Sequence, residues 1–253
     1  MQSTDVTSLD SSNVSERKFL LIADNNKSSS SGLKALLKQF RYKVWIVETA
    51  SEALELIDIV TPALVIIGQI EDKSQIDLTR EIRQSTPSGT ASVLVITAGH
   101  DAAHDRACLA AGAITCLKFP LNVETLYRTI QVAIEPVPRM NLRINTHVPV
   151  IIDDKNLVCR EGKFATALSE SGLFLMTPDP CPLNTKIPIK FKVAGKILSA
   201  EAVVIYTHEF GNKSYFEPGM GLQFIRISDQ DQEEIRLFIR EAVRKAISSA
   251  RQK

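Results

Sequence analysis

The chain has 253 residues, a length that suits two domains of ordinary size better than one small module. Hydrophobic residues make up 44% and charged residues 23%, which is typical of a folded soluble protein. With 30 basic and 29 acidic side chains the formal net charge is +1, so bulk electrostatic attraction is excluded as the basis of binding to DNA or to an anionic membrane.

The sequence also lacks the patterns of a membrane or secreted protein. Its apolar runs are far too short to span a bilayer, and the polar, acidic N-terminus has no signal-peptide pattern. We therefore expect a cytoplasmic protein that contacts neither membrane nor DNA. Four cysteines are scattered without a CxxC or Cys/His spacing, which predicts reduced thiols and no metal site. They are Cys108, Cys116, Cys159 and Cys181.

The first half of the chain alternates strand and helix patterns. Residues 1–15 are polar and are predicted to form a flexible tail, and an α/β domain is predicted over 16–135. Strands as apolar as these are buried on both faces, which indicates a doubly wound, five-stranded parallel sheet with helices on each side. The predicted strands are 19–23, 44–47, 63–67, 93–97 and 115–119.

The second half has the pattern of an antiparallel β domain. Two prolines in Glu135–Pro138 end the helical pattern and favour an extended joint, so a second domain is predicted over 136–253. Six short runs that alternate or are punctuated by Gly and Pro suggest a small barrel, and one apolar stripe from Ile235 to Ile247 predicts a closing helix. The predicted strands are 148–152, 164–168, 173–176, 187–193, 197–206 and 220–227.

The first domain resembles the receiver domain of two-component response regulators. The resemblance rests on Leu20–Asn25 with its acidic end, on Pro62–Ile67 and on Val95–Ala98, with Thr97 in the hydroxyl position. In the family, a carboxylate after the third strand accepts a phosphoryl group, neighbouring carboxylates hold Mg²⁺, and a lysine neutralises the acyl phosphate.

Three positions depart from the receiver chemistry. Gly68 stands where the acceptor Asp belongs, Asn25 replaces one member of the acidic pair beside Asp24, and Phe119 takes the place of the lysine. Lys118 is one residue early, so its side chain is expected on the other face of the strand. We interpret the domain as a pseudo-receiver that is not phosphorylated. A simpler interpretation of Asp24 is that it is a turn or helix-cap residue. A simpler interpretation of Thr97 is that its hydroxyl bonds to the backbone.

The second domain resembles the PilZ domain, a family that binds the bacterial second messenger cyclic di-GMP. Arg139 and Arg143 match its RxxxR segment, and Ser169 and Gly172 match the (D/N)xSxxG segment. The resemblance implies that these four residues contact the ligand. The chemistry is suitable, because guanidinium groups form paired, charged hydrogen bonds with phosphate oxygens and with the edge of guanine.

One position departs from the PilZ pattern, because Ala167 stands where the family has Asp or Asn. Loss of one acceptor whose partner stays buried costs about 1–3 kcal/mol, which weakens binding roughly ten- to a hundredfold or abolishes it. A solvated linker is the alternative reading of the two arginines, and an ordinary strand-end turn is the alternative for Ser169 and Gly172.

The sequence contains no nucleophile–base pair and no phosphate-binding loop, so we expect no enzymatic activity. The leading hypothesis is a signalling adaptor that senses cyclic di-GMP and acts through an unidentified protein partner, with homodimerisation left open. A scaffold of two degenerate domains that binds no ligand is the alternative, favoured by Ala167. A phosphorylated regulator with an unusual acceptor is a third reading, which Gly68 disfavours.

Overall fold

The computed structural model describes residues 18–85, 91–99, 101–152, 164–208 and 217–250. The predicted tail over 1–15 and Cys159 lie outside these residues. No helix in the described ranges is both long and apolar enough to cross a membrane.

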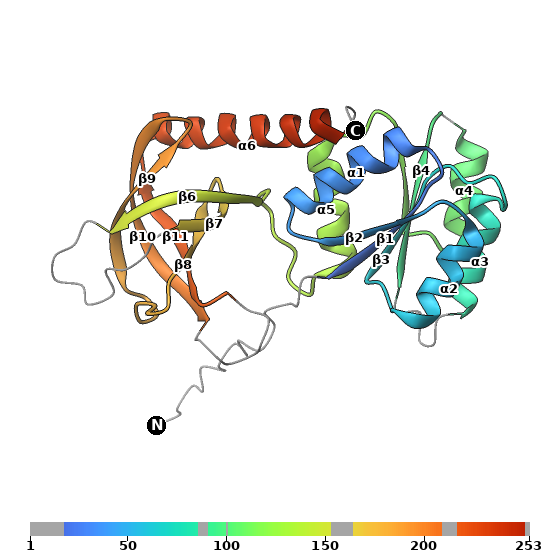
Figure 1. Cartoon of the computed structure of the whole chain (residues 1–253), viewed down its shortest axis with the longest axis horizontal. Coiled ribbons are helices and arrows are strands. Elements are labelled where there is room, and N and C mark those ends of the chain that lie inside the picture. Colours follow the sequence, from blue (N-terminus) through green and yellow to red (C-terminus); the bar gives the residue numbers. More distant parts are fainter. Residues whose placement is uncertain (1–17, 86–90, 100, 153–163, 209–216, 251–253) are drawn as a thin grey trace, which may run out of the picture.

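The first domain is the predicted doubly wound sheet (Figure 1). All pairings between its strands are parallel, and their order is β2-β1-β3-β4-β5. The carboxyl ends of the strands therefore meet at one edge, where α/β folds place their ligand sites. In chain order the elements are β1 (Phe19–Ala23), α1 (Lys27–Gln39), β2 (Lys43–Val47), α2 (Ala50–Ile59), β3 (Leu64–Ile67), α3 (Gln75–Ser85), β4 (Ser92–Thr97), α4 (Ala102–Ala110), β5 (Thr115–Lys118) and α5 (Val123–Ile134).

Alternate residues of the parallel strands enter two different apolar layers. Leu20 and Ile22 of β1 face the layer under α1 and α5, whereas Leu21 and Ala23 face the layer under α2, α3 and α4. Both layers are closed to water, which explains why the strands read as uninterrupted apolar runs.

The second domain is the predicted antiparallel barrel with a closing helix. Its strands close in the order β10-β11-β8-β7-β6-β9. Along β9 the side chains alternate strictly, so that Ile187, Ile189 and Phe191 fill the interior. The exposed positions of the strand are Lys186, Pro188, Lys190 and Lys192. The elements are β6 (Ile144–Ile152), β7 (Phe164–Ser169), β8 (Gly172–Met176), β9 (Lys186–Val193), β10 (Lys196–His208), β11 (Gly219–Ile227) and α6 (Asp229–Ala250).

The state of the cysteines differs in part from the prediction. Cys108 and Cys116 are free thiols, as expected. Cys181, which is fully buried after β8, is disulfide-bonded, so the prediction of a reduced thiol is wrong at this residue. The spacing in sequence could not reveal this bond, because the pairing of cysteines cannot be deduced from sequence alone.

Helix α6 does more than close the barrel, because it also packs against the first domain. Its first half buries Ile235 and Ile239 against the barrel. Its second half extends over α1 and buries Val243, while Ile247 is partly buried beyond it. Figure 1 shows the helix lying across the top of both domains. The barrel interior and the α1–α5 layer thereby form one continuous hydrophobic cluster.

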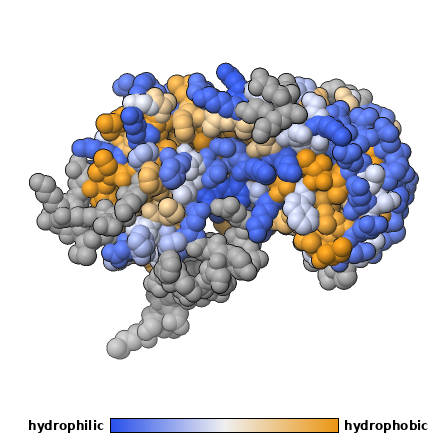
Figure 2. All heavy atoms as spheres, viewed as in Figure 1, coloured by the Kyte–Doolittle hydropathy of each residue, from blue (hydrophilic) through white to orange (hydrophobic). Residues whose placement is uncertain are grey.

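Polar contacts join the domains below this helix. Arg41, just after α1, donates from Nη1 to the carbonyl of Thr166 over 2.7 Å and lies 3.3 Å from the carboxylate of Glu217. Gln39 donates to the carbonyl of Asn145 over 2.8 Å. Figure 2 shows a hydrophilic surface between the two domains on this face, with apolar surface gathered farther out on each domain.

The role of α6 can be tested with a charge on its receiver-facing side. Val243→Asp would place a carboxylate in the α1–α6 contact, and detachment of the helix end costs less than burying an unpaired charge. We expect a larger radius of gyration by small-angle X-ray scattering. Ser248→Asp, which adds the same charge at an exposed position of the same helix, should leave the radius unchanged. Equal radii for Val243→Asp and the native protein would contradict the contact.

Candidate functional site

The first candidate site is the carboxyl edge of the receiver-like sheet. The structure brings Asp24, Gly68, Thr97 and Phe119 to this edge at the ends of β1, β3, β4 and β5. Asn25 follows Asp24, and its backbone N–H donates to the carbonyl of Gln69 over 2.8 Å. It is not among the residues that line the cavity at this edge. Sequence analysis therefore predicted the location of this group of residues, although not its packing.

Asp24 fills the space that a side chain at position 68 would need. A Cβ atom added to Gly68 would lie 2.5 Å from both Cγ and Oδ2 of Asp24. The Asp24 side chain is held there because its carboxylate accepts hydrogen bonds from the Ser29 hydroxyl, over 2.6 Å, and from the Asn26 N–H, over 2.9 Å. Asp24 is only 6% exposed. Gly68 is thus a packing requirement of this arrangement as well as a missing nucleophile.

The lysine next to this edge does not face the place where a phosphoryl group would lie. Lys118 extends toward α4, where its Nζ lies 3.0 Å from a carboxylate oxygen of Asp105. Phe119 is 43% exposed and contributes an apolar ring to the edge. Thr97 directs its hydroxyl to the carbonyl of Gly99 at 3.4 Å. Among the described residues that line this edge, no side chain supplies the positive charge that a phosphoryl group would need.

Sequence analysis missed Gln75, the first residue of α3. Its Nε2 donates to the carbonyls of Gly68, over 2.6 Å, and Ile96, over 3.0 Å, and its Oε1 lies 2.8 Å from His104 Nε2. One amide therefore ties the ends of β3 and β4 to α4. A glutamine at a helix start carries no motif that would single it out. Across the described residues, no group of three or more His, Cys, Asp or Glu is arranged to hold a metal ion.

The second candidate site begins with the arginine segment that leads into the barrel. Arg143 directly precedes β6, and the exposed Arg139 lies four residues earlier. The backbone N–H of Arg139 donates to Gln131 Oε1 over 3.0 Å. Burial raises the pKa of the Tyr127 hydroxyl, and the charges of Arg139 and Arg143, with a backbone hydrogen bond from Arg143, act in the opposite direction. The arm formed by residues 139–143 therefore lies along α5 of the first domain.

Gln131 is the second residue that sequence analysis missed. It is only 2% exposed within the apolar stripe of α5. Its Nε2 donates to the Tyr42 hydroxyl over 2.7 Å, while its Oε1 accepts from Arg139. A buried amide needs both kinds of partner, and here one partner belongs to the first domain and the other to the arm. Gln131 is thus a polar link between the two domains.

The motif residues on β7 and β8 form a tight strand-end turn. Ser169 is 2% exposed, and its hydroxyl donates to the carbonyl of Gly172 over 3.1 Å. A Cβ on Gly172 would lie 2.1 Å from the carbonyl oxygen of Leu222, so only glycine allows β11 to approach this closely. Ala167 is 6% exposed and follows Thr166, the residue that Arg41 contacts. The structure thus gives Ser169 and Gly172 a local structural role. The arm enters the barrel next to this turn, because Ile144, directly after Arg143, pairs with Leu168, directly before Ser169.

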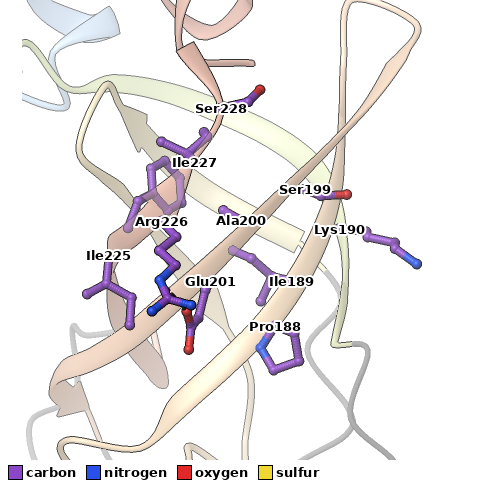
Figure 3. Close-up of a pocket in the computed structure, with 11 residues that line it drawn as sticks. Pro188, Ile189, Lys190, Ser199, Ala200, Glu201, Ile225, Arg226, Ile227 and Ser228 are labelled. Carbon is purple, nitrogen blue, oxygen red and sulfur yellow. Dashed lines mark ion pairs between the residues drawn. The ribbon is translucent and has the colours of Figure 1, made fainter. Parts of the chain in front are cut away.

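The barrel also carries a groove of about 790 Å³ over β9, β10 and β11. Figure 3 shows the side chains of Arg226 and Glu201 meeting in its centre, where they lie 3.5 Å apart. None of the four residues that match the PilZ signature lines this groove. Since its central charges are already paired with each other, we do not assign it to the nucleotide.

Comparisons with known proteins match the two halves separately. Residues 20–131 match the family model of the response regulator receiver domain, and residues 138–241 match that of the PilZ domain. No curated protein matches the chain.

Solved structures of receiver domains resemble the first half. A two-component response regulator from Clostridium difficile is 22% identical, with 47% of this chain and 97% of that chain covered and a TM-score of 0.44. A signal receiver domain from Bermanella marisrubri is 21% identical over 47% of this chain and 100% of that one, with a TM-score of 0.44. A receiver domain protein from Methanospirillum hungatei JF-1 is 22% identical, with 47% of this chain and 95% of that chain covered and a TM-score of 0.44.

The sheet order, the closed barrel and the two family models agree on the architecture. Both kinds of domain are regulatory signalling modules, and PilZ domains bind cyclic di-GMP. The chain is therefore a response-regulator-like signalling protein in which a receiver domain is followed by a PilZ domain.

Proposed function

We propose that this protein is a cytoplasmic signalling adaptor that binds cyclic di-GMP through its PilZ domain and passes the signal on by protein contacts. The observation that carries the proposal is the position of the arginine arm, which resembles the RxxxR segment of PilZ domains and is hydrogen-bonded to α5 of the receiver domain. A ligand that recruits this arm therefore acts directly on the contact between the domains.

The arginines provide the ligand chemistry. Arg139 is exposed and Arg143 partly exposed, so their guanidinium groups can reach a nucleotide at the barrel wall. Forked guanidinium donors suit phosphates and the guanine edge, and Arg also stacks on flat bases. In this proposal Ser169 and Gly172 contribute chiefly by shaping the turn, because the fold already uses the hydroxyl of one and the missing side chain of the other.

Signal transmission follows from the two hydrogen bonds that hold the arm. A ligand shifts a conformational equilibrium only when it contacts the two states differently. Moving the arm onto a nucleotide would break or weaken the bond from Arg139 to Gln131 and the bond between Arg143 and Tyr127. We propose that this exchange changes the receiver surface offered to a protein partner.

We further propose that the receiver domain is not phosphorylated. Gly68 supplies no nucleophile, Asp24 occupies the adjoining space, and Lys118 is paired with Asp105. The receiver then serves as a docking surface for a protein partner or for a second copy of the chain. We take residues 16–135 and 136–253 as the two units, with the proline joint at their boundary.

The second candidate function is a scaffold that binds no nucleotide. It is favoured by Ala167, which lacks the expected acceptor, and by the structural use of Ser169 and Gly172. The arginine arm would then serve only the contact between domains. Nucleotide titration separates this candidate from the sensor.

Packing around Gly68 predicts a measurable interaction with Asp24. Gly68→Ala should lower the free energy of unfolding by about 1–3 kcal/mol, because the new methyl group overlaps the Asp24 carboxylate. In the Asp24→Ala background the same change should cost much less, since the overlap is removed. Urea unfolding of the four proteins of this double-mutant cycle gives the coupling. Equal costs in both backgrounds would show that Asp24 does not fill this space.

Incubation with acetyl phosphate and Mg²⁺ should leave the intact mass of the protein unchanged. The reason is the absence of a carboxylate at position 68 and the pairing of Lys118 with Asp105. A conventional receiver domain, treated in parallel, is the positive control. A stable phosphoryl adduct mapped to a residue of the receiver domain would overturn this part of the proposal.

Calorimetric titration with cyclic di-GMP should show binding, which Arg143→Ala weakens about ten- to a hundredfold through the loss of charge-assisted hydrogen bonds. Arg139→Ala should act similarly. Arg226→Ala removes an equally exposed arginine on another part of the barrel and should have little effect. Ala167→Asn, which restores a neutral acceptor at a buried position, should tighten binding. If neither the native protein nor folded Ala167→Asn binds, the scaffold replaces the sensor.

A further inference from the structure

A cavity of about 390 Å³ opens at the carboxyl edge of the receiver sheet, a volume in the range of small-molecule sites. It is bounded by α1, by the ends of the strands, by the segment between β5 and α5, and by the end of α6. The described residues that line it are Asp24, Asn26, Ser28, Ser29, Gly32, Leu33, Leu36, Gln69, Ile96, Thr97, Ala98, Phe119, Pro120, Leu121, Val123 and Ile247.

Gly32 keeps the cavity open from the side of α1. It is buried in the first half of the helix, where glycine is less favourable than alanine. A Cβ atom there would meet no atom within 4 Å, so no close approach of another element explains the glycine. Its φ is also not positive. The glycine therefore leaves part of the cavity empty, because a side chain at position 32 would extend into it.

The lining determines the charge of a suitable occupant. Asp24 is the only charged residue among the described lining residues, and no lysine, arginine or histidine is among them. Its carboxylate accepts one hydrogen bond at each oxygen and retains further acceptor capacity. The remaining wall combines aliphatic side chains and the ring of Phe119 with neutral polar residues, which are Asn26, Ser28, Ser29, Gln69 and Thr97. An anion would meet a carboxylate here with no compensating cation, whereas an amine would find an acceptor next to apolar walls.

Residues of both domains line the cavity, because Ile247 is among them. It lies in the last turns of α6, the helix that begins on the barrel, and it is the one described residue of the PilZ half that lines the cavity. A molecule bound here contacts α1 and α6 at once. Occupancy of the cavity would therefore stabilise the docked position of α6.

We propose that this cavity binds a compact apolar molecule that bears an amine, with the amine donating to Asp24 and the apolar body resting between Gly32, Phe119 and Ile247. The site lies where a conventional receiver is phosphorylated, so ligand occupancy takes the place of the phosphoryl group as an input to this domain. The proposal does not depend on whether the PilZ domain binds cyclic di-GMP.

Three probes of similar size and different charge test the site on the full chain: 2-phenylethylamine, 2-phenylethanol and phenylacetate. We expect the amine to bind in the millimolar range, the alcohol more weakly and the anion not at all. Binding is followed by protein NMR through the methyl signals of Leu33, Ile96 and Ile247, which should shift together. Absence of amine binding, or equal binding of the anion, would overturn the proposal.

Variants locate the bound probe. Gly32→Met should fill the cavity and weaken amine binding at least about tenfold without lowering the unfolding temperature, because its side chain enters empty space. Ala110→Met adds the same side chain at an exposed position of α4 and should change nothing. Gly32→Ala fills less of the cavity and should have an intermediate effect on amine binding. It replaces Gly32→Met in the test if the methionine variant does not fold. Asp24→Asn should weaken the amine and spare the alcohol. Unchanged amine affinity in Gly32→Met and Asp24→Asn would overturn the proposal.

Discussion

Helix α6 is the constraint on which the arrangement of this protein depends, because one rigid element is buried in two places. Ile235 and Ile239 fix it to the barrel, and Val243 is buried where it crosses α1. Its 22 residues span roughly 33 Å, so the distance between the two contacts cannot change unless the helix bends or one contact opens. The orientation of the barrel relative to the receiver sheet is therefore set by packing on α6, while the proline joint allows other orientations once that packing is lost.

The two candidate sites both adjoin the contact between the domains. The arginine arm is held to α5 through Gln131 and Tyr127, and the cavity at the edge of the sheet is closed in part by Ile247. Both sites thus include groups from each half of the chain. A change at either one alters contacts that also determine how the domains are docked, which is the physical requirement for coupling between sites.

Most of the fold could be predicted from local patterns, because apolar runs and helix periodicity record burial directly. Strand β9 is an example, since its strict alternation fixes which face is inside. The start of β6 was predicted late, at residue 148, because polar residues fill a stretch that pairs with β7 across a register shift. The reach of α6 onto α1 could not be predicted, because an apolar stripe shows that a face is buried and not what buries it.

The candidate site was predictable only where chemistry is carried by a residue type at a known spacing. Gly68 and Phe119 stood out because they replace reactive groups, yet the insertion of Asp24 beside Gly68 depends on side-chain direction. Gln75 and Gln131 carry no motif, and their importance comes from partners supplied by other elements. Ser169 matched a ligand motif, but its burial and its bond to Gly172 are visible only in three dimensions.

Hydrogen–deuterium exchange with and without saturating cyclic di-GMP tests the central claim, that events at the PilZ domain reach the receiver through the arm and α6. The account predicts changed exchange in α5 and in α1, in addition to changes in the barrel, because the arm is bonded to one of these helices and α6 packs on the other. Changes confined to the barrel at saturating nucleotide would contradict the account, since the two domains would then respond independently.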